Sequence, residues 1–474
     1  MTQNASEEQI RKIVEAVVQQ IVAGGGEGTG GAGGGSGGVF QTVDEAVEAA
    51  TRAQKALVEM SLEVRKKIVE AIRATARDNA QDFSQRTLTE TGMGRLEDKI
   101  KKHFGAADLT PGVEDLEASS WTGDHGLTVV EMAPWGVIGA VTPSTHPVPT
   151  MVNNAICIIA AGNSVVFNVH PAAKEVSMYA VQMLNRAIVA VGGPPDLITA
   201  IESPTIESAN QIFTHPGIKL LLITGGPGVV NAAMGSPKKV IAAGPGNPPV
   251  VVDETADLEK AARDIIDGGA FDNNILCIGE KQVFVVDKVA DELKRLMVQY
   301  SAYELDAGQI EQLAQHAFVA GQDGHPVVNR DLVGRSAHVL GQRIGLHLDE
   351  SLRMLIGETD AGHIFVEEER MMPFLPIIRV PNVDQGIRAA LISEHGYKHT
   401  AIIHSRNIEN MHKMARIMDT TIFVKNGASV AGLGIGGEGF GTFSIAGPTG
   451  EGITAPRTFT RQRRCALVDY FRIT

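Results

Sequence analysis

The middle of the chain alternates apolar runs of strand length with segments of helical period, and this alternation limits the fold more than any other feature. In chain order the segments are a helix at 150–161, a strand at 164–169, a helix at 173–191, a strand at 197–201, a helix at 206–214 and a strand at 219–224. Apolar strands that are separated by helices form parallel sheets with helices on both faces. The sequence therefore predicts a doubly wound α/β fold.

Two further regions flank this one. Residues 42–108 have mostly helical spacing, and strand-like runs at 127–132 and 137–141 enclose a Pro-Trp-Gly turn signal that predicts a hairpin. After a strand at 250–253, more strands are expected at 282–286, 363–367, 377–380, 400–404 and 421–425. A chain of 474 residues is too long for one ordinary core, so we expect two or three domains.

Charge and cysteine content exclude several classes of protein. The formal net charge of -13 argues against a general nucleic-acid binder. Three widely spaced cysteines show no metal-ligand or disulfide pattern and indicate a reducing cytosol. The sequence has no run of about 18 apolar residues and no signal peptide, so we expect neither membrane spanning nor secretion.

The N-terminal segment is expected to be a docking helix on a flexible tether. Residues 6–23 carry an apolar stripe at helical spacing, formed by Ile10, Ile13, Val14, Val17, Val18, Ile21 and Val22. The glycine-rich residues 24–38 behave as a flexible coil. A short helix on such a tether is expected to dock on another surface. Two alternatives stay open: the helix packs on its own domain, or it is disordered.

The three cysteines differ in their surroundings. Cys157 has apolar neighbours on both sides and is expected in the core. Cys277 lies between a polar turn signal and a strand, whereas Cys465 follows several arginines whose charge favours a reactive thiolate. Residue chemistry alone therefore leaves Cys277 and Cys465 as alternative nucleophiles.

Residues 224–228 form a glycine-containing turn between an expected strand and an expected helix. Such a turn lets the backbone approach a phosphate at the helix N-terminus. The turn lacks the GxGxxG pattern, so an ordinary tight turn explains it nearly as well.

Several motifs, in this order along the chain, carry a resemblance to a known family. They are Pro143-Ser144-Thr145-His146-Pro147, Ala161-Gly162-Asn163-Ser164, His170-Pro171, Thr224-Gly225-Gly226-Pro227-Gly228, Gly246-Asn247-Pro248-Pro249-Val250 and Cys277. From about residue 39 to its end the chain resembles the CoA-acylating branch of the aldehyde dehydrogenase superfamily. It is most similar to the propionaldehyde dehydrogenase type of propanediol- and ethanolamine-utilising bacterial microcompartments, through residues 90–94, 110–116 and 436–440.

The resemblance implies an aldehyde dehydrogenase-like α/β fold with a Rossmann-type cofactor domain, a catalytic domain and a small oligomerisation segment. The implied parts are a docking or encapsulation helix at 1–23, a linker at 24–38, a mainly cofactor-binding domain at 39–253, a catalytic domain at 254–440 and a C-terminal oligomerisation segment at 441–474. The hairpin near 127–141 is expected to contribute to a homo-oligomer, a dimer or a tetramer.

The resemblance also implies the chemistry. Cys277 holds the nucleophile position, and Thr145 stands where hydrolytic relatives use an asparagine to bind the oxyanion. Those relatives activate water with a glutamate, whereas the aligned position here is Ala243. The thioester on Cys277 is therefore expected to react with the thiol of CoA. No role is assigned to His146 or to His399, and no metal is expected.

The expected cofactor is NAD, with coenzyme A as co-substrate. The implied cofactor-binding residues are Thr224, Gly225, Gly226, Pro227, Gly228, His170 and Pro171. The expected substrate is a small aldehyde, propionaldehyde in the relatives. The expected location is the bacterial cytoplasm, inside a microcompartment whose shell or core proteins bind residues 1–23. The rival functions are a hydrolytic aldehyde dehydrogenase and a non-catalytic scaffold.

Overall fold

The computed structural model describes residues 37–321 and 324–472. The predicted docking helix lies outside the described residues, as does nearly all of the predicted linker. Among the described residues, no helix combines the length and the apolar character needed to cross a membrane.

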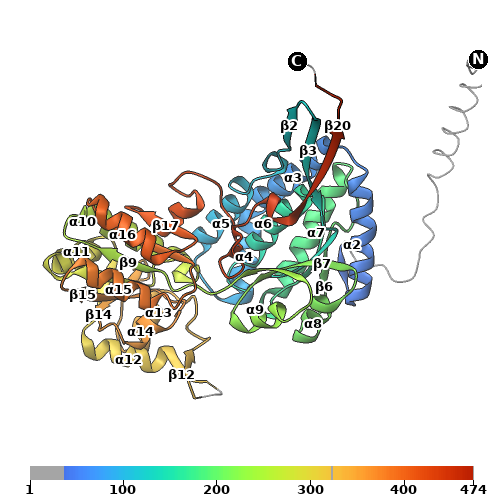
Figure 1. Ribbon diagram of the computed structural model, residues 1–474. Coiled ribbons are helices and arrows are strands. Elements are labelled where there is room, and N and C mark those ends of the chain that lie inside the picture. The colour runs from blue at the N-terminus through green and yellow to red at the C-terminus, as the bar shows by residue number, and fades with distance from the viewer. Residues whose placement is uncertain (1–36, 322–323, 473–474) are drawn as a thin grey trace, which may run out of the picture. The chain divides into compact units, whose positions relative to one another are not determined.

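The first sheet has six parallel strands and contains the alternating region (Figure 1). In spatial order its strands are β1 (Val39–Phe40), β6 (Ile198–Ile201), β5 (Ser164–Asn168), β4 (Val137–Val141), β7 (Ile218–Thr224) and β8 (Lys239–Ala243). Every neighbouring pair is parallel. The central strands β4 and β5 are buried at every residue, as expected for a sheet covered on both faces.

Helices cover both faces of this sheet. The helices α2 (Val43–Val58), α8 (Ile206–Thr214) and α9 (Pro227–Met234) pack on one face. The helices α3 (Leu62–Asp78), α4 (Ala80–Thr91), α5 (Leu96–Asp108), α6 (Pro147–Ala160) and α7 (Lys174–Ala190) form the core on the other. The prediction of a doubly wound α/β fold is confirmed.

The second sheet has seven parallel strands. In spatial order they are β11 (Ala302–Glu304), β14 (Met354–Glu358), β15 (Phe374–Val380), β10 (Gln282–Val286), β9 (Pro249–Val252), β16 (Thr400–His404) and β17 (Ile422–Lys425). The helices of this region are α10 (Leu258–Gly269), α11 (Asp287–Gln299), α12 (Ala307–Ala317), α13 (Ala337–Arg343), α14 (Ile364–Glu367), α15 (Val383–Ser393) and α16 (Ile408–Met418). Because β9 pairs with β10 and β16, the chain changes sheets in the turn at 244–248, before the expected boundary at residue 253.

Two predictions about strands are wrong. Residues 363–367 were expected as a strand but form the short helix α14, because the His363 ring accepts a hydrogen bond from the Phe365 N–H and caps the turn. The runs at 127–132 and 137–141 do not pair as a hairpin, because β4 is buried between parallel neighbours in the first sheet. Asn163 Oδ1 accepts from the N–H groups of Trp135 and Gly136 and so holds the crossing between the two sheets.

A third, antiparallel sheet contains β2 (Ser119–Gly123), β3 (Gly126–Pro134) and β20 (Thr460–Val468), with β3 in the middle. Figure 1 shows these strands side by side. The hairpin is therefore β2–β3, and the C-terminal strand joins it. Shorter pairs are β12 (Phe318–Ala320) with β13 (Pro326–Val328) and β18 (Ile445–Ala446) with β19 (Gly452–Ile453).

Candidate active site

Cys277 lies in the segment between the 3-10 turn Phe271–Asn274 and β10. Asp272, Asn273 and Asn274 in this turn all have left-handed backbone angles, with φ values of 48°, 57° and 64°. Asp and Asn tolerate these angles better than other residues with side chains. The Asn274 amide donates to two backbone carbonyls at 2.6 and 2.9 Å. The candidate nucleophile is therefore carried by a turn that buried hydrogen bonds hold in an uncommon conformation.

The Cys277 thiol is half-buried, and its surroundings favour the protonated form. Burial raises the pKa of the Cys277 thiol to about 12, and the nearby Glu369 carboxylate adds to the rise. The Lys281 ammonium and the backbone N–H groups of Cys277 and Ile278 oppose it. Because the thiolate is the nucleophilic form, a group at the site must accept the thiol proton before or during attack.

The other two cysteines lie in different surroundings. Cys157 is fully buried in α6, and burial raises the pKa of its thiol far above the ordinary value. Cys465 is exposed on β20, where it lines a surface groove of the antiparallel sheet. The prediction that Cys157 is a core residue is confirmed.

The turn between β8 and β9 packs closely against Cys277. A Cβ atom at Gly246 would lie 2.5 Å from the Cys277 carbonyl oxygen and 2.9 Å from Cγ of His399. The backbone N–H of Gly246 is near enough to the Glu369 carboxylate to oppose the rise in its pKa that burial causes. Gly246 therefore brings the thiol loop, an imidazole and a carboxylate together at one point.

His399 is buried and electrically neutral at neutral pH. Burial, and next the charge of Lys281, lowers the pKa of His399 to about 4. Its Nδ1 lies 2.9 Å from Thr400 Oγ1, while its Nε2 has no hydrogen-bond partner among the described residues. A neutral imidazole with an unused nitrogen can accept a proton.

Thr145 lies in the loop between β4 and α6, half-buried beside His146. Thr145 Oγ1 is 3.0 Å from His146 Nδ1, and Lys102 Nζ donates to the Thr145 carbonyl at 3.2 Å. Burial, followed by the charges of Lys102 and Lys99, lowers the pKa of His146 well below its ordinary value. His146 is therefore neutral at neutral pH, and when its Nδ1 carries the proton, the Thr145 hydroxyl is free to donate its own.

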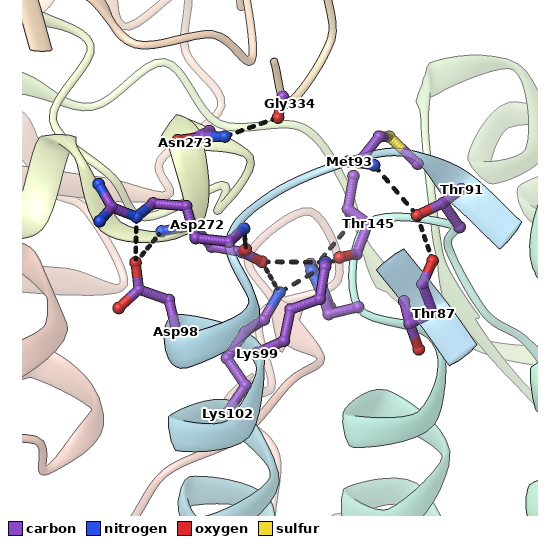
Figure 2. Close-up of polar contacts among 12 residues, drawn as sticks. Thr87, Thr91, Met93, Asp98, Lys99, Lys102, Thr145, Asp272, Asn273 and Gly334 are labelled. Atoms are coloured by element: carbon purple, nitrogen blue, oxygen red, sulfur yellow. Dashed lines mark hydrogen bonds and ion pairs between the residues drawn. The ribbon is translucent and has the colours of Figure 1, made fainter. Parts of the chain in front are cut away.

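A buried cluster of charges from α5 meets the turn before Cys277 (Figure 2). Lys99 and Lys102 are each 2% exposed, Asp98 is 4% exposed and Asp272 is fully buried. Both ammonium groups pair with Asp272 Oδ2, Lys99 at 3.3 Å. Charged side chains are rarely this buried in proteins unless they form ion pairs, as these do.

The predicted cofactor residues lie at one edge of the first sheet. His170 and Pro171 follow β5, Thr145 follows β4, Thr224 ends β7, and residues 225–228 follow it. These three strands are adjacent and parallel, so their carboxyl ends meet at that edge. The carboxyl edge is where open α/β sheets bind ligands.

The glycine turn at this edge is open. Gly226, Pro227 and Gly228 are exposed, and a Cβ at Gly226 or Gly228 would meet no atom within 4 Å. Gly226 directly precedes α9, so the turn leads into a helix N-terminus. These features fit the phosphates of a dinucleotide. Among the described residues, no group of three or more His, Cys, Asp or Glu is placed to hold a metal ion.

Comparison with known protein families gives a match over more than half of the chain. Residues 38–321 match the model of the aldehyde dehydrogenase family. The chain belongs to the aldehyde dehydrogenase family. It is 53% identical to acetaldehyde dehydrogenase (acetylating) EutE of Salmonella typhimurium, over 87% of this chain and 89% of the relative. It is 45% identical to propanal dehydrogenase (CoA-propanoylating) of Citrobacter freundii, over 87% of this chain and 88% of the relative.

Several solved structures match the fold. A Rhodopseudomonas palustris propionaldehyde dehydrogenase with bound CoA and an acylated cysteine has a TM-score of 0.89 and 45% identity, covering 92% of this chain and 99% of that one. An engineered glycolyl-CoA reductase with bound NADP+ has a TM-score of 0.90 and 45% identity, covering 93% and 99%. A propionaldehyde dehydrogenase from the Clostridium phytofermentans fucose utilisation bacterial microcompartment has a TM-score of 0.90 and 44% identity, covering 92% and 100%. The resemblance to CoA-acylating aldehyde dehydrogenases is confirmed.

Sequence reasoning missed Glu369, which lies near Cys277, and the buried lysines Lys99 and Lys102 of α5, which pair with Asp272 in the turn before Cys277. Lys99 and Lys102 are three residues apart and face the core with His103 and Ala106. Two lysines on the buried face of a helix are a signal that the sequence contained. The contact of Gly246 with Cys277 had no such signal, because it joins two turns whose meeting depends on strand pairing in the second sheet.

Proposed function

We propose that this protein is a CoA-acylating aldehyde dehydrogenase that oxidises a small aldehyde to an acyl-CoA through a thioester on Cys277. The function rests on the family and its acylating relatives. The observation that carries the residue assignment is Gly246, which packs between the Cys277 carbonyl and the His399 ring. The substrate proposed for this chain is acetaldehyde or propionaldehyde, the aldehydes of the relatives.

The first chemical step is attack of the Cys277 sulfur on the aldehyde carbon, in which the thiol proton is proposed to pass to His399 Nε2 and from there to solvent. The developing oxyanion is held by the Cys277 N–H and the Thr145 hydroxyl, which donates when His146 Nδ1–H donates to it. The nicotinamide cofactor, when bound, would supply the hydride acceptor for oxidation of the former aldehyde carbon. Residues 224–228, His170 and Pro171 are proposed to hold that cofactor at the carboxyl edge of the first sheet.

The second step transfers the acyl group from Cys277 to CoA. His399 is proposed to accept the proton of the CoA thiol at Nε2, because the imidazole is neutral and this nitrogen has no partner among the described residues. Residue 243 provides no general base that could activate water in the same way. Ala243 ends β8 with 4% exposure and has no carboxylate. The thioester is therefore expected to wait for CoA.

Rapid mixing of enzyme, NAD and aldehyde tests this function. Without CoA, NADH should form in a burst equal to the enzyme concentration and then nearly stop; with CoA, turnover should continue and yield acyl-CoA. The Cys277→Ala variant should show no burst, whereas Cys465→Ala should behave like wild type. Equal steady-state rates with and without CoA would instead support the hydrolytic function.

A homo-oligomer is proposed to form through the antiparallel sheet β2–β3–β20. Large apolar side chains are exposed along and just beyond this sheet, namely Trp121, Leu467, Val468, Tyr470 and Phe471. A groove of about 720 Å³ lies against the same strands. Exposed apolar surface of this kind marks an interaction site. Light scattering coupled to size-exclusion chromatography should give a dimer or a tetramer for wild type and a smaller species for Leu467→Asp.

Location inside a bacterial microcompartment is proposed through residues 1–23, which lie outside the described residues. The support is the apolar stripe of that segment and the microcompartment origin of one solved relative. A fluorescent protein fused to residues 1–23 should enter microcompartments. A version with Asp at Val14 and Val17 should not, because docking would bury two charges. Equal entry of both fusions would refute the docking role.

A further inference from the structure

We propose that Lys102 is a positioning residue whose single ammonium group fixes the Thr145 loop relative to the Cys277 loop. The proposal rests on the proposed function, in which these two loops supply the two oxyanion donors. The Cys277 loop belongs to the second α/β region, and the Thr145 loop belongs to the first. A group that contacts both loops can set the distance between the donors.

Lys102 makes both contacts from α5. Its Nζ donates to the Thr145 carbonyl at 3.2 Å and forms an ion pair with Asp272 Oδ2. Figure 2 shows the ammonium between these two partners. Lys102 is 2% exposed, so water does not compete with either contact, and a charge-assisted hydrogen bond in such surroundings is strong.

Asp272 transmits the position of Lys102 to the thiol loop. It lies five residues before Cys277 in the sequence. Its Oδ1 accepts from the Arg95 N–H at 2.7 Å, and its own N–H donates to Asp98 Oδ2 at 3.0 Å. The turn that carries Cys277 is thus bound through Asp272 to Lys99, Lys102 and Asp98 of α5 and to Arg95, the residue before that helix. A shift of α5 or of the Lys102 ammonium would move both loops.

Lys99 provides a matched control within the same cluster. It lies one helical turn before Lys102, is equally buried, and pairs with the same Asp272 oxygen at 3.3 Å. Among the described residues, Lys99 has no hydrogen bond to Thr145. Removal of either lysine leaves the buried carboxylate with one ammonium partner. Loss of the bridge between the loops follows only from removal of Lys102.

The experiment compares Lys102→Met with Lys99→Met in the full chain, on a Cys465→Ser background. Three quantities are measured: the melting temperature, the rate of the NADH burst without CoA, and the rate of Cys277 modification by methyl methanethiosulfonate. This reagent has no carbonyl group, so its reaction needs the thiolate but not the oxyanion donors. A displacement of about 1 Å at reacting groups lowers rates by about 100-fold.

We expect the burst rate of Lys102→Met to fall by about 100-fold, while Lys99→Met keeps a burst rate close to wild type. Modification of Cys277 should stay similar in both variants. Equal falls in the burst rate of the two variants would overturn the proposal, and so would parallel loss of Cys277 modification in Lys102→Met, since each indicates general disruption of the turn.

A second pair keeps the test decisive if Lys102→Met does not fold. Lys102→Arg and Lys99→Arg both keep the positive charge beside Asp272, but a planar guanidinium cannot reproduce the position of the ammonium. A slowed burst in Lys102→Arg alone supports the bridge, and equal rates overturn it. Failure of the proposed function would give a different result, because the Cys277→Ala variant would then show the same NADH burst as the wild-type enzyme.

Discussion

Substitution of Gly246 by alanine tests whether the turn at 244–248 sets the position of the thiol loop. The φ angle of Gly246 is not in the left-handed region, so alanine is compatible with the backbone. The added Cβ would lie 2.5 Å from the Cys277 carbonyl oxygen and 2.9 Å from Cγ of His399. Neither neighbour is the end of a flexible side chain, so the loop itself must move.

The size of that movement follows from the contact distances. Ordinary contact with a Cβ begins at 3.4 Å, so relief of the clash needs a displacement of about 1 Å, which is enough to slow a positioned reaction by about 100-fold. Overpacking of a buried site lowers the free energy of unfolding by about 1–3 kcal/mol. Gly246→Ala is therefore expected to fold, with a slow NADH burst.

The matched control is Gly244→Ala in the same turn. A Cβ at Gly244 would meet a single atom within 4 Å, Cγ of Pro448 at 3.3 Å. Stopped-flow measurement of the NADH burst should show a large decrease for Gly246→Ala and little change for Gly244→Ala, with melting temperatures measured in parallel. A burst rate of Gly246→Ala close to wild type would refute the inferred packing of this turn against the thiol loop.

Three further predictions concern the cysteines and the oxyanion donor. Cys157→Ala should lower the free energy of unfolding in urea by roughly 1 kcal/mol or more, because it removes a buried group; an unchanged midpoint would contradict its core position. The pKa of Cys277 near 12 leaves the thiol protonated at lower pH, so alkylation attributable to Cys277 should rise about tenfold per pH unit between pH 7 and 10. A plateau below pH 10 would contradict that pKa. Thr145→Val should lower kcat about 100- to 1,000-fold while Thr145→Ser keeps most of it, and similar kcat values for both would exclude the hydroxyl as a donor.

Local sequence patterns were sufficient to predict most helices and strands of the two parallel-sheet regions. The bounds of α8, β10 and β16 match the expected residues 206–214, 282–286 and 400–404, because apolar periodicity within a segment reports how that segment is buried. The parallel arrangement also followed from the sequence, since strands separated by helices have few other ways to bury both faces.

Pairing partners and packed charges were decided by the tertiary structure. Residues 127–132 and 137–141 have similar strand patterns, yet they belong to different sheets. The first run pairs with β2 and with the distant strand β20, whereas the second pairs with β5 and β7. Residue chemistry alone left Cys277 and Cys465 as alternatives. Gly246 contacts the Cys277 loop from 31 positions away along the chain. Lys102 joins Asp272, 170 positions away, to Thr145, 43 positions away. The periodicity of apolar residues in one segment specifies which face of that segment is buried. It does not specify which distant side chain will pack against that face.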